Sequence, residues 1–258
     1  MNVDLLRFLD RFIGLPLCWA CTFVRWLARF IRAPRTLPAP GNVLIIKLSE
    51  MGSTVLAYPA VMELKRRCPE ARLFFLVFKN NAAIFEALDL VSSAHVITVD
   101  MSSALRALTS GFRALSYLRQ QRIDTTVDMD FFSRFTALLS FLLCRGNRVG
   151  FHRYTDEGPW RGNLLTHRVL YSPHVHTAVA FMALIRTLFE NPADEPHYKG
   201  RITFEELPVP RYAPAGDDVT RVRNKLRTAG IAANDSQALI LINPNSSEIF
   251  PLRRWPLE

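Results

Sequence analysis

One loop near the beginning of the chain gathers side chains that bind anions and transfer protons. It follows the apolar run Val43–Ile46. It carries an amine, a carboxylate, two hydroxyls and a glycine: Lys47, Glu50, Ser49, Ser53 and Gly52. A positioned carboxylate serves as a general base, and a lysine binds phosphate or carboxylate groups as a point charge. The loop is therefore the first candidate for a catalytic or binding site.

The sequence around this loop has the pattern of a strand followed by a helix. The run Val43–Ile46 predicts a strand buried on both faces, as in a parallel sheet. Apolar residues at helical spacing from Val55 to Leu64 predict a helix after the loop. Ligands of such sheets bind at the carboxyl ends of strands, where a helix N-terminus favours an anion. The nucleotide fingerprints GxGxxG and GxxxxGKS/T are absent, so an ordinary βα turn stays open as the alternative.

Strands and helices alternate along the next part of the chain. Apolar runs predict strands over 71–78, 95–99 and 125–128, and helical spacing predicts helices over 82–88, 103–121 and 131–144. This alternation indicates an α/β fold with a Rossmann-like, doubly wound parallel sheet. Asp128 and Asp130 end one of these strands, so they are further candidates for catalytic carboxylates.

Residues 145–173 read as an irregular, polar and aromatic segment. The segment is rich in basic side chains, namely Arg145, Arg148, His152, Arg153, Arg161, His167 and Arg168. Because loops carry binding residues more often than core elements do, the segment is a candidate acceptor-binding rim, with a solvated connection as the alternative. His174 and His176 then precede a helix predicted to run through Phe189, and no third metal ligand is evident beside them.

A second unit of the same kind begins near the end of the sequence. The segment 190–218 is rich in Pro, Asp and Glu, a polar helix is predicted over 219–229, and Ala238–Ile242 predicts another buried strand before a polar loop. One strand and its loop do not make a domain, so we expect this unit to be incomplete. The predicted domains are residues 1–36, 37–215 and 216–258.

Residues 1–36 predict an amphipathic helix. On an ideal helix the charged residues, among them Asp10, Arg25 and Arg29, fall within an arc of roughly 120°, and large apolar residues occupy the rest. A wide apolar face with Trp and flanking Arg is typical of a helix lying in a membrane interface. A helix packed on the domain, a true span and a signal peptide are the alternatives. The uncharged run Phe12–Val24 is shorter than the roughly 20 residues that a span needs.

The composition favours an anionic partner. The net charge is +9, and of the 32 basic residues only five are Lys, which leaves 27 Arg. Arg is the better ligand for phosphate, although genome composition alone can also produce an Arg-rich chain. No helix-turn-helix, zinc-finger or RNA-binding pattern is present, so nucleic acid is not an expected partner. The four cysteines form no zinc framework, and Cys18 and Cys21 read as apolar helix residues.

Three separated segments, in order, resemble one family. IIKLSEMGSTVLAYPA is similar to the opening of glycosyltransferase family 9, the lipopolysaccharide heptosyltransferases, with its pattern I-x-K-x-S-x-x-G-D-x-x-x-x-x-P-A. TTVDMDFFSRFTALLSFLLCRGNRVGF resembles the segment that runs from D-x-x-I-D-L-Q to R-x-x-G-F. LILINPNSSEIFPLRRWPLE resembles the start of the second domain, which ends in K/R-x-W-P-x-E.

The resemblance implies a GT-B architecture of two Rossmann-like domains, the first for the acceptor and the second for the nucleotide-sugar donor. It implies an inverting transfer of a heptose or similar sugar, without metal or cofactor, to lipopolysaccharide or another cell-envelope glycan. The expected acceptor-binding residues are Lys47, Ser49 and Gly52 of the loop, together with Arg153 of the basic segment. The donor phosphate-binding residues that the resemblance implies are Ser246, Ser247 and Arg253. An anionic membrane surface as partner, and a peripheral place on the cytoplasmic face of the bacterial inner membrane, fit such an acceptor.

The sequence departs from the family at the catalytic base. Ser53 stands where the family has an aspartate, so Glu50, in the same loop, is the preferred base, and Asp130 is the next candidate. Two alternatives stay open. One is a non-catalytic, membrane-associated module that binds a saccharide or a partner. The other is an unrelated nucleotide-binding regulator.

Overall fold

The structure is a computed structural model. It describes residue 8 and residues 10–31, 37–48, 50–131, 133–152, 160–194, 201–203, 207–214, 216–231, 240–242 and 255. The chain divides into two compact units, Met1–Arg211 and Tyr212–Glu258. The second unit contains the helix α9, Gly216–Thr228, where a polar helix is predicted.

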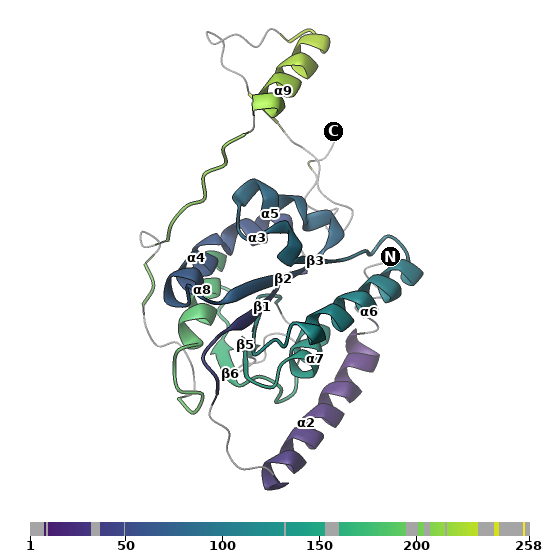
Figure 1. Cartoon of the computed structure of the whole chain (residues 1–258), viewed down its shortest axis with the longest axis vertical. Helices are drawn as coiled ribbons and strands as arrows, with labels where there is room; N and C mark the ends of the chain where they lie inside the picture. The colour runs from purple at the N-terminus through teal and green to yellow at the C-terminus, as the bar shows by residue number, and fades with distance from the viewer. Residues whose placement is uncertain are drawn as a thin grey trace. The chain divides into compact units, whose positions relative to one another are not determined.

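The first unit is built on a parallel six-stranded sheet (Figure 1). Its strands are β1 (Asn42–Ile46), β2 (Arg72–Phe78), β3 (Val96–Val99), β4 (Thr125–Asp128), β5 (Asn147–His152) and β6 (His167–Leu170). They lie in the order β3-β2-β1-β4-β5-β6, and every neighbouring pair is parallel. The expected doubly wound α/β sheet is confirmed.

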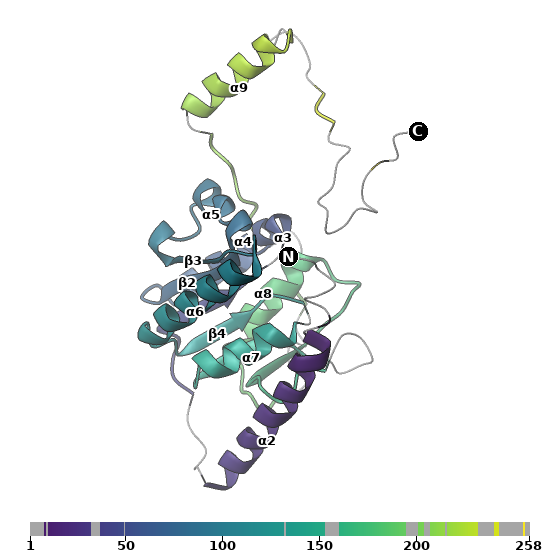
Figure 2. The same ribbon diagram turned by 90° about the vertical axis from the view of Figure 1, so that its right-hand side faces the viewer.

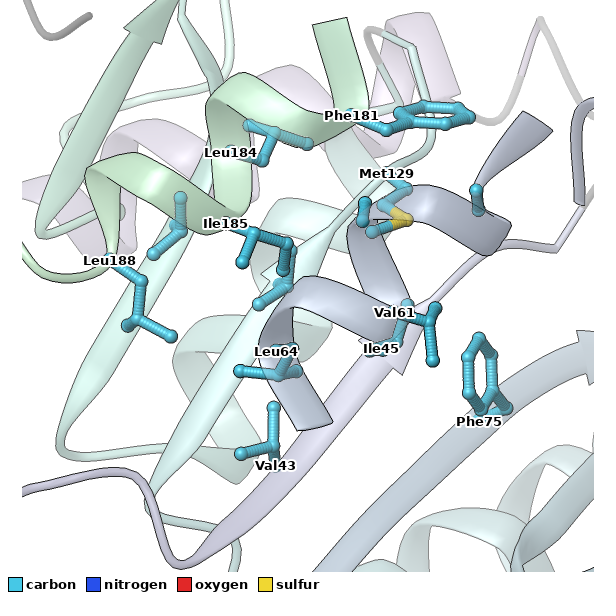
Figure 3. Packing of buried hydrophobic residues seen from close by; sticks show 14 of the residues in the cluster. Val43, Ile45, Val61, Leu64, Phe75, Met129, Phe181, Leu184, Ile185 and Leu188 are labelled. Carbon is cyan, nitrogen blue, oxygen red and sulfur yellow. The ribbon is translucent and has the colours of Figure 1, made fainter. Parts of the chain in front are cut away.

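Helices cover both faces of this sheet. One face carries α3 (Met51–Leu56), α4 (Tyr58–Arg67), α5 (Ala83–Leu88) and α8 (Thr177–Thr187), and the other carries α6 (Ala104–Gln120) and α7 (Arg134–Leu143). Figure 3 shows the first layer, where Val61 and Leu64 of α4 lie beside Ile45 of β1 and Leu184 of α8 belongs to the same apolar cluster. Both faces of β1 are buried, as expected for an inner strand of a parallel sheet that has helices on both sides.

Two strands lie where the sequence suggests an irregular segment. The prediction that 145–173 is irregular is wrong, because β5 and β6 extend the sheet there. Both strands carry buried polar residues instead of an apolar run, and this hides them from a hydropathy pattern. Asn147 donates to the carbonyl oxygen of Pro38 at 2.8 Å, and Arg148 donates to that of Leu164 at 2.7 Å, so hydrogen bonds compensate the burial.

The strand expected over Ala238–Ile242 is absent from the described part of that segment. Ile240, Leu241 and Ile242 are irregular and largely exposed, with Leu241 96% accessible. A strand needs a neighbour for its backbone groups, and the described residues of the second unit contain no other strand.

The N-terminal segment contains a helix that packs on the sheet domain. A π-helical turn, Asp10–Gly14, leads into α2, Leu15–Ile31, and Pro16 lies in the first turn of α2, where a proline is tolerated. Figure 2 shows α2 beside α7. Within the described residues, no helix has both the length and the apolar character that spanning a bilayer demands.

Candidate functional site

The carboxyl ends of β1 and β4 form the switch point of the sheet. The chain proceeds outward from β1 through β2 to β3 and then returns to the opposite side of β1 with β4. The connections after β1 and β4 therefore leave in opposite directions, which opens a crevice where ligands bind in folds of this class. Lys47 follows β1 directly, and Asp130 lies two residues beyond β4.

A buried ion pair joins the two strand ends at this point. The amine Nζ of Lys47 lies 3.2 Å from Oδ1 of Asp130, and the two side chains are 1% and 7% exposed. The backbone N–H of Leu48 donates to Oδ2 of the same carboxylate at 2.8 Å. Both carboxylate oxygens are thus engaged, so Asp130 holds the loop after β1 against the loop after β4.

A second buried pair supports the first. Oδ1 of Asp128 accepts from the backbone N–H of Asp130 at 3.1 Å, while its Oδ2 pairs with the guanidinium of Arg161. Arg161 also donates to Oγ1 of Thr136 and to the carbonyl oxygen of Phe151, each at 3.0 Å. Burial raises the pKa of the Asp128 carboxyl, and the Arg161 charge opposes that rise. The loop that carries Asp130 is therefore anchored to the core.

Glu50 has the exposed carboxylate of the loop. Its backbone has φ 64° and ψ 98°, a strained conformation for a residue with a side chain. Its carbonyl oxygen accepts from Oγ of Ser53 at 2.8 Å and from the backbone N–H of Thr54 at 3.2 Å. These bonds hold the turn while the side chain extends into solvent. Such strain concentrates at functional sites, where neighbouring contacts hold the backbone in place.

Ser53 has a structural role in this geometry. Its side chain is 8% exposed, and its hydroxyl donates to the Glu50 carbonyl. It therefore positions Glu50. Gly52, at the start of α3, is exposed, and a Cβ there would meet nothing within 4 Å. The α3 helix has only six residues, so a helix-dipole contribution at its N-terminus is small.

Residues at the end of β2 also bind the loop that follows β1. Nδ2 of Asn81 donates to the carbonyl oxygen of Leu48 at 2.9 Å, and the backbone N–H of Phe78 donates to the same oxygen at 3.1 Å. Sequence reasoning missed Asn81, Thr54 and the role of Arg161, because each acts through a contact distant in sequence or through backbone atoms. The sequence signal that pointed to Arg161 was weak: Asp128 ends a predicted buried strand, and a buried carboxylate needs a partner.

The structure brings some of the predicted site residues together. Lys47 and Asp130 are in contact, and Gly52 and Ser53 lie in the first turn of α3, directly after Glu50. The remaining predicted site residues lie outside the described residues, namely Ser49, Arg153, Ser246, Ser247 and Arg253.

The proposed basic rim needs correction. Arg148, Arg161 and His167 are 6%, 2% and 1% exposed, so none of the three can form part of a surface rim. Hydrogen bonds compensate this burial, as those from Arg148 to the carbonyl oxygens of Leu164 and Cys144 do.

His176, one of the two histidines of the H-x-H sequence, caps a helix end. Nδ1 of His176 accepts from the backbone N–H of Ala178 at 3.2 Å, which caps α8. Among the residues that the structure describes, no group of three His, Cys, Asp or Glu side chains is arranged to hold a metal ion.

Comparisons with known proteins identify the fold. Neither a scan against protein-family models nor a search of curated proteins finds a match. Solved structures do match. The E. coli ADP-heptose lps heptosyltransferase II is 17% identical with a TM-score of 0.57 over 83% of this chain and 57% of that chain. A glycosyl transferase family 9 protein from Veillonella parvula DSM 2008 is 12% identical with a TM-score of 0.58, over 86% of this chain and 58% of that chain.

E. coli heptosyltransferase WaaC also matches, at 20% identity and a TM-score of 0.49, over 62% of this chain and 51% of that chain. The chain thus spans between half and three fifths of the length of these structures. Its fold is the α/β fold of GT-B glycosyltransferases, as the resemblance to glycosyltransferase family 9 implies.

Proposed function

We propose that the chain belongs to a glycosyltransferase and that the loop after β1 forms part of its active site. One observation carries the proposal: Glu50, with a fixed backbone and an exposed carboxylate, lies at the switch point of a sheet that has the fold of family 9 glycosyltransferases. The E. coli protein with the same fold is named an ADP-heptose heptosyltransferase of lipopolysaccharide. We therefore propose a nucleotide sugar as donor, a heptose or similar sugar as the group transferred, and a lipid-linked or core oligosaccharide of the cell envelope as acceptor.

The proposed step is an inverting displacement. Glu50 removes the proton from an acceptor hydroxyl, and that oxygen forms a bond to the anomeric carbon of the sugar. The bond between the anomeric carbon and the phosphate oxygen breaks on the opposite face, and the nucleoside diphosphate leaves with the electron pair. The reaction as proposed uses neither metal nor cofactor, because positive side chains stabilise the charge of the departing diphosphate.

Each proposed residue has a distinct role in this step. Lys47, Asp130 and Ser53 are positioning residues, since the first two join the strand ends and Ser53 holds the turn at Glu50. Ser49, Gly52 and Arg153 are proposed to contact the acceptor in the domain 37–215. Ser246, Ser247 and Arg253 are proposed to contact the donor diphosphate at the start of the second domain, 216–258.

A peripheral position on the cytoplasmic face of the inner membrane is part of the proposal. Its support is α2, whose large apolar residues, among them Trp19 and Phe23, are exposed. The polar contacts of α2 are directed toward the domain instead: Nη1 of Arg25 donates to the carbonyl oxygen of Leu165 at 2.7 Å, and Oγ1 of Thr22 accepts from the N–H of Asn163 at 3.0 Å. An outward apolar face on a docked helix suits an enzyme whose acceptor is anchored in a membrane.

A second candidate function is a non-catalytic saccharide- or partner-binding module. The observation that favours it is Ser53, which replaces the aspartate of the family pattern and is engaged with the Glu50 carbonyl. The experiment that separates the two measures sugar transfer and acceptor binding by the full-length protein. Turnover that is lost in Glu50→Gln supports the enzyme. Saturable acceptor binding without turnover in the wild-type protein supports the module.

A further inference from the structure

Three helices form one outer side of the first unit. The helices α6 and α7 cover the same face of the sheet, and α2 packs on α7. Figure 2 views this side and shows α2, α7 and α6 next to one another. The outward surface of these helices is called the α2–α6–α7 face below.

Large apolar side chains point outward from all three helices. On α6, Leu105, Leu108 and Phe112 recur at helical spacing and are 72%, 73% and 72% exposed. On α7, Phe135 and Leu142 are more than half exposed, and on α2 the exposed apolar side chains are Leu17, Trp19, Phe23, Val24, Trp26 and Leu27. A monomeric soluble protein seldom exposes an apolar surface that continues across several elements, and such surfaces mark interaction sites.

The outward direction of these side chains is fixed by the core. The opposite side of α6 packs Ala114 and Leu118 onto the sheet, so its exposed side chains cannot turn inward without removing that packing. On α2 the inward side is occupied by Cys18, which is fully buried against Ala137 and Leu164. The exposure of these apolar side chains therefore follows from the packing of the helices on the domain.

The charge of this face indicates the kind of partner that it can bind. The helices α2, α6 and α7 contain no Lys, Asp or Glu. Of their six Arg, Arg25 and Arg134 are directed toward the domain, the first to a backbone carbonyl and the second to Asp10. Arg106, Arg113 and Arg119 of α6 are exposed. The helices of the opposite layer differ, since they carry Glu63 and Glu86 among their basic residues. A face that is apolar, carries exposed arginines on α6 and has no carboxylate from its own helices complements an anionic lipid surface, which offers acyl chains and negative headgroups together.

The same charge argues against a second copy of this chain as the occupant. A symmetric dimer through this face would bring the exposed arginines of both copies close together without a carboxylate from these helices to pair with them.

We propose that the α2–α6–α7 face binds the surface of an anionic lipid bilayer, with side chains of α6 and α7 as well as α2 in contact with lipid. This inference extends the proposed membrane attachment through α2, and it does not require that the protein transfers sugar. It places Leu108 and Phe112 in the acyl region and Arg113 at the headgroups.

The test is co-sedimentation of the full chain with vesicles. Vesicles of phosphatidylcholine mixed with phosphatidylglycerol are compared with vesicles of phosphatidylcholine alone. Leu108→Ser combined with Phe112→Ser removes two exposed apolar side chains from α6 and should weaken binding at least about tenfold. Arg113→Gln should weaken binding to the anionic vesicles roughly fivefold and leave binding to the neutral vesicles unchanged. Because all three residues are exposed, the variants should keep the unfolding temperature of the wild type.

Matched controls use exposed residues outside this face. Val209→Ser and Arg201→Gln change the same kinds of side chain and should leave vesicle binding unchanged. Phe23→Ser tests α2 by itself. If Phe23→Ser weakens binding and the α6 double variant does not, α6 is not in contact with lipid and this inference is overturned, while attachment through α2 stands.

Two further results would also overturn it. The first is equal binding of the wild type to anionic and neutral vesicles. The second is self-association in analytical ultracentrifugation that Leu108→Ser with Phe112→Ser abolishes, in a protein that does not bind vesicles. The second result would assign the face to a copy of the same chain.

Discussion

An ion pair between Lys47 and Asp130 joins the ends of β1 and β4, the two strands at which the strand order of the sheet reverses. The atoms Nζ and Oδ1 are 3.2 Å apart. Neither residue belongs to a strand, yet both are almost fully buried. Burying two charges costs free energy that their attraction only partly returns, so the contact is better understood as fixing the geometry of the site than as a source of stability.

The buried ion pair should respond to single substitutions far more than an exposed pair does. Lys47→Met leaves the Asp130 carboxylate buried beside an apolar side chain, and we expect it to lower the free energy of unfolding by about 3–5 kcal/mol. Lys47→Met combined with Asp130→Leu should recover much of this loss. The measurement is urea unfolding followed by circular dichroism.

The matched control for the ion pair is Lys79→Met. Lys79 pairs with Asp100 at 3.1 Å, but its side chain is 64% exposed. Its loss should cost less than about 1 kcal/mol. Equal costs for the two lysine variants would refute the buried pair.

The docking of α2 should depend on a glycine in the facing loop. Gly162 has φ +72°, and a Cβ there would lie 2.7 Å from Oγ1 of Thr22 and 3.0 Å from the carbonyl oxygen of Cys18. Gly162→Ala should therefore destabilise the protein by about 1–2 kcal/mol. Gly111→Ala, in the middle of α6 with nothing within 4 Å, should be neutral or stabilising. A thermal unfolding series that ranks the two variants in the reverse order would refute the packing of α2.

Thiol reactivity gives a second test of that docking. Cys18 is fully buried, and burial raises the pKa of its thiol to about 11. In the native protein Cys18 should resist alkylation near neutral pH. The reagent cannot reach the buried sulfur, and the thiol is protonated at this pH. Asp10→Asn removes the partner of Arg134, which lies 3.0 Å away, and should speed alkylation of Cys18.

Cys144 is the internal control for the alkylation experiment. It is also buried, and burial raises the pKa of its thiol to about 11. Cys144 lies in the apolar cluster between the sheet and the helices α6 and α7, and α2 does not cover it. Mass spectrometry after brief alkylation identifies the modified thiol. Rapid modification of Cys18 in the wild-type protein would show that α2 does not stay docked.

The pH dependence of stability should contain a contribution from Glu63. A hydrogen bond from Arg66 lowers the pKa of Glu63 to about 2, and Arg67 contributes to the same shift. Since the pKa in the folded state is below that in the unfolded state, the contribution is fully present above about pH 4.5 and is lost as the pH falls toward 2. The wild type should exceed Glu63→Gln in stability by up to about 1 kcal/mol near neutral pH. The difference should disappear in urea titrations near pH 2, and a difference that grows on acidification would contradict the assignment.

The sheet was predictable where apolar side chains dominate. The strands β1 and β2 are continuous branched and aromatic runs, and β4 differs from its predicted range at neither end. The strands β5 and β6 were not predictable in the same way, because Asn147, Arg148 and His167 are buried by hydrogen bonds that connect residues distant in sequence. A hydropathy pattern does not contain such partners.

The candidate site remains a prediction, and only part of its geometry could be derived from the sequence. Residues that follow a buried strand lie at the carboxyl edge of a sheet, so Lys47, Glu50 and Asp130 could be selected from the sequence alone. The positive φ of Glu50, the bond from Ser53 to its carbonyl and the support of Asp128 by Arg161 depend on tertiary contacts. The side of α2 that faces the domain likewise depends on tertiary contacts, such as the burial of Cys18 against Ala137 and Leu164.

The most direct test of the central claim is sugar transfer by the full-length protein, compared between the wild type and Glu50→Gln, with Glu70→Gln as the exposed-carboxylate control. The account predicts that Glu50→Gln lowers turnover by about 100-fold or more while the unfolding temperature stays unchanged, because the side chain is exposed and acts on the acceptor proton. Glu70→Gln should leave turnover unchanged. Undiminished turnover in Glu50→Gln would contradict the assignment of this loop as the catalytic site.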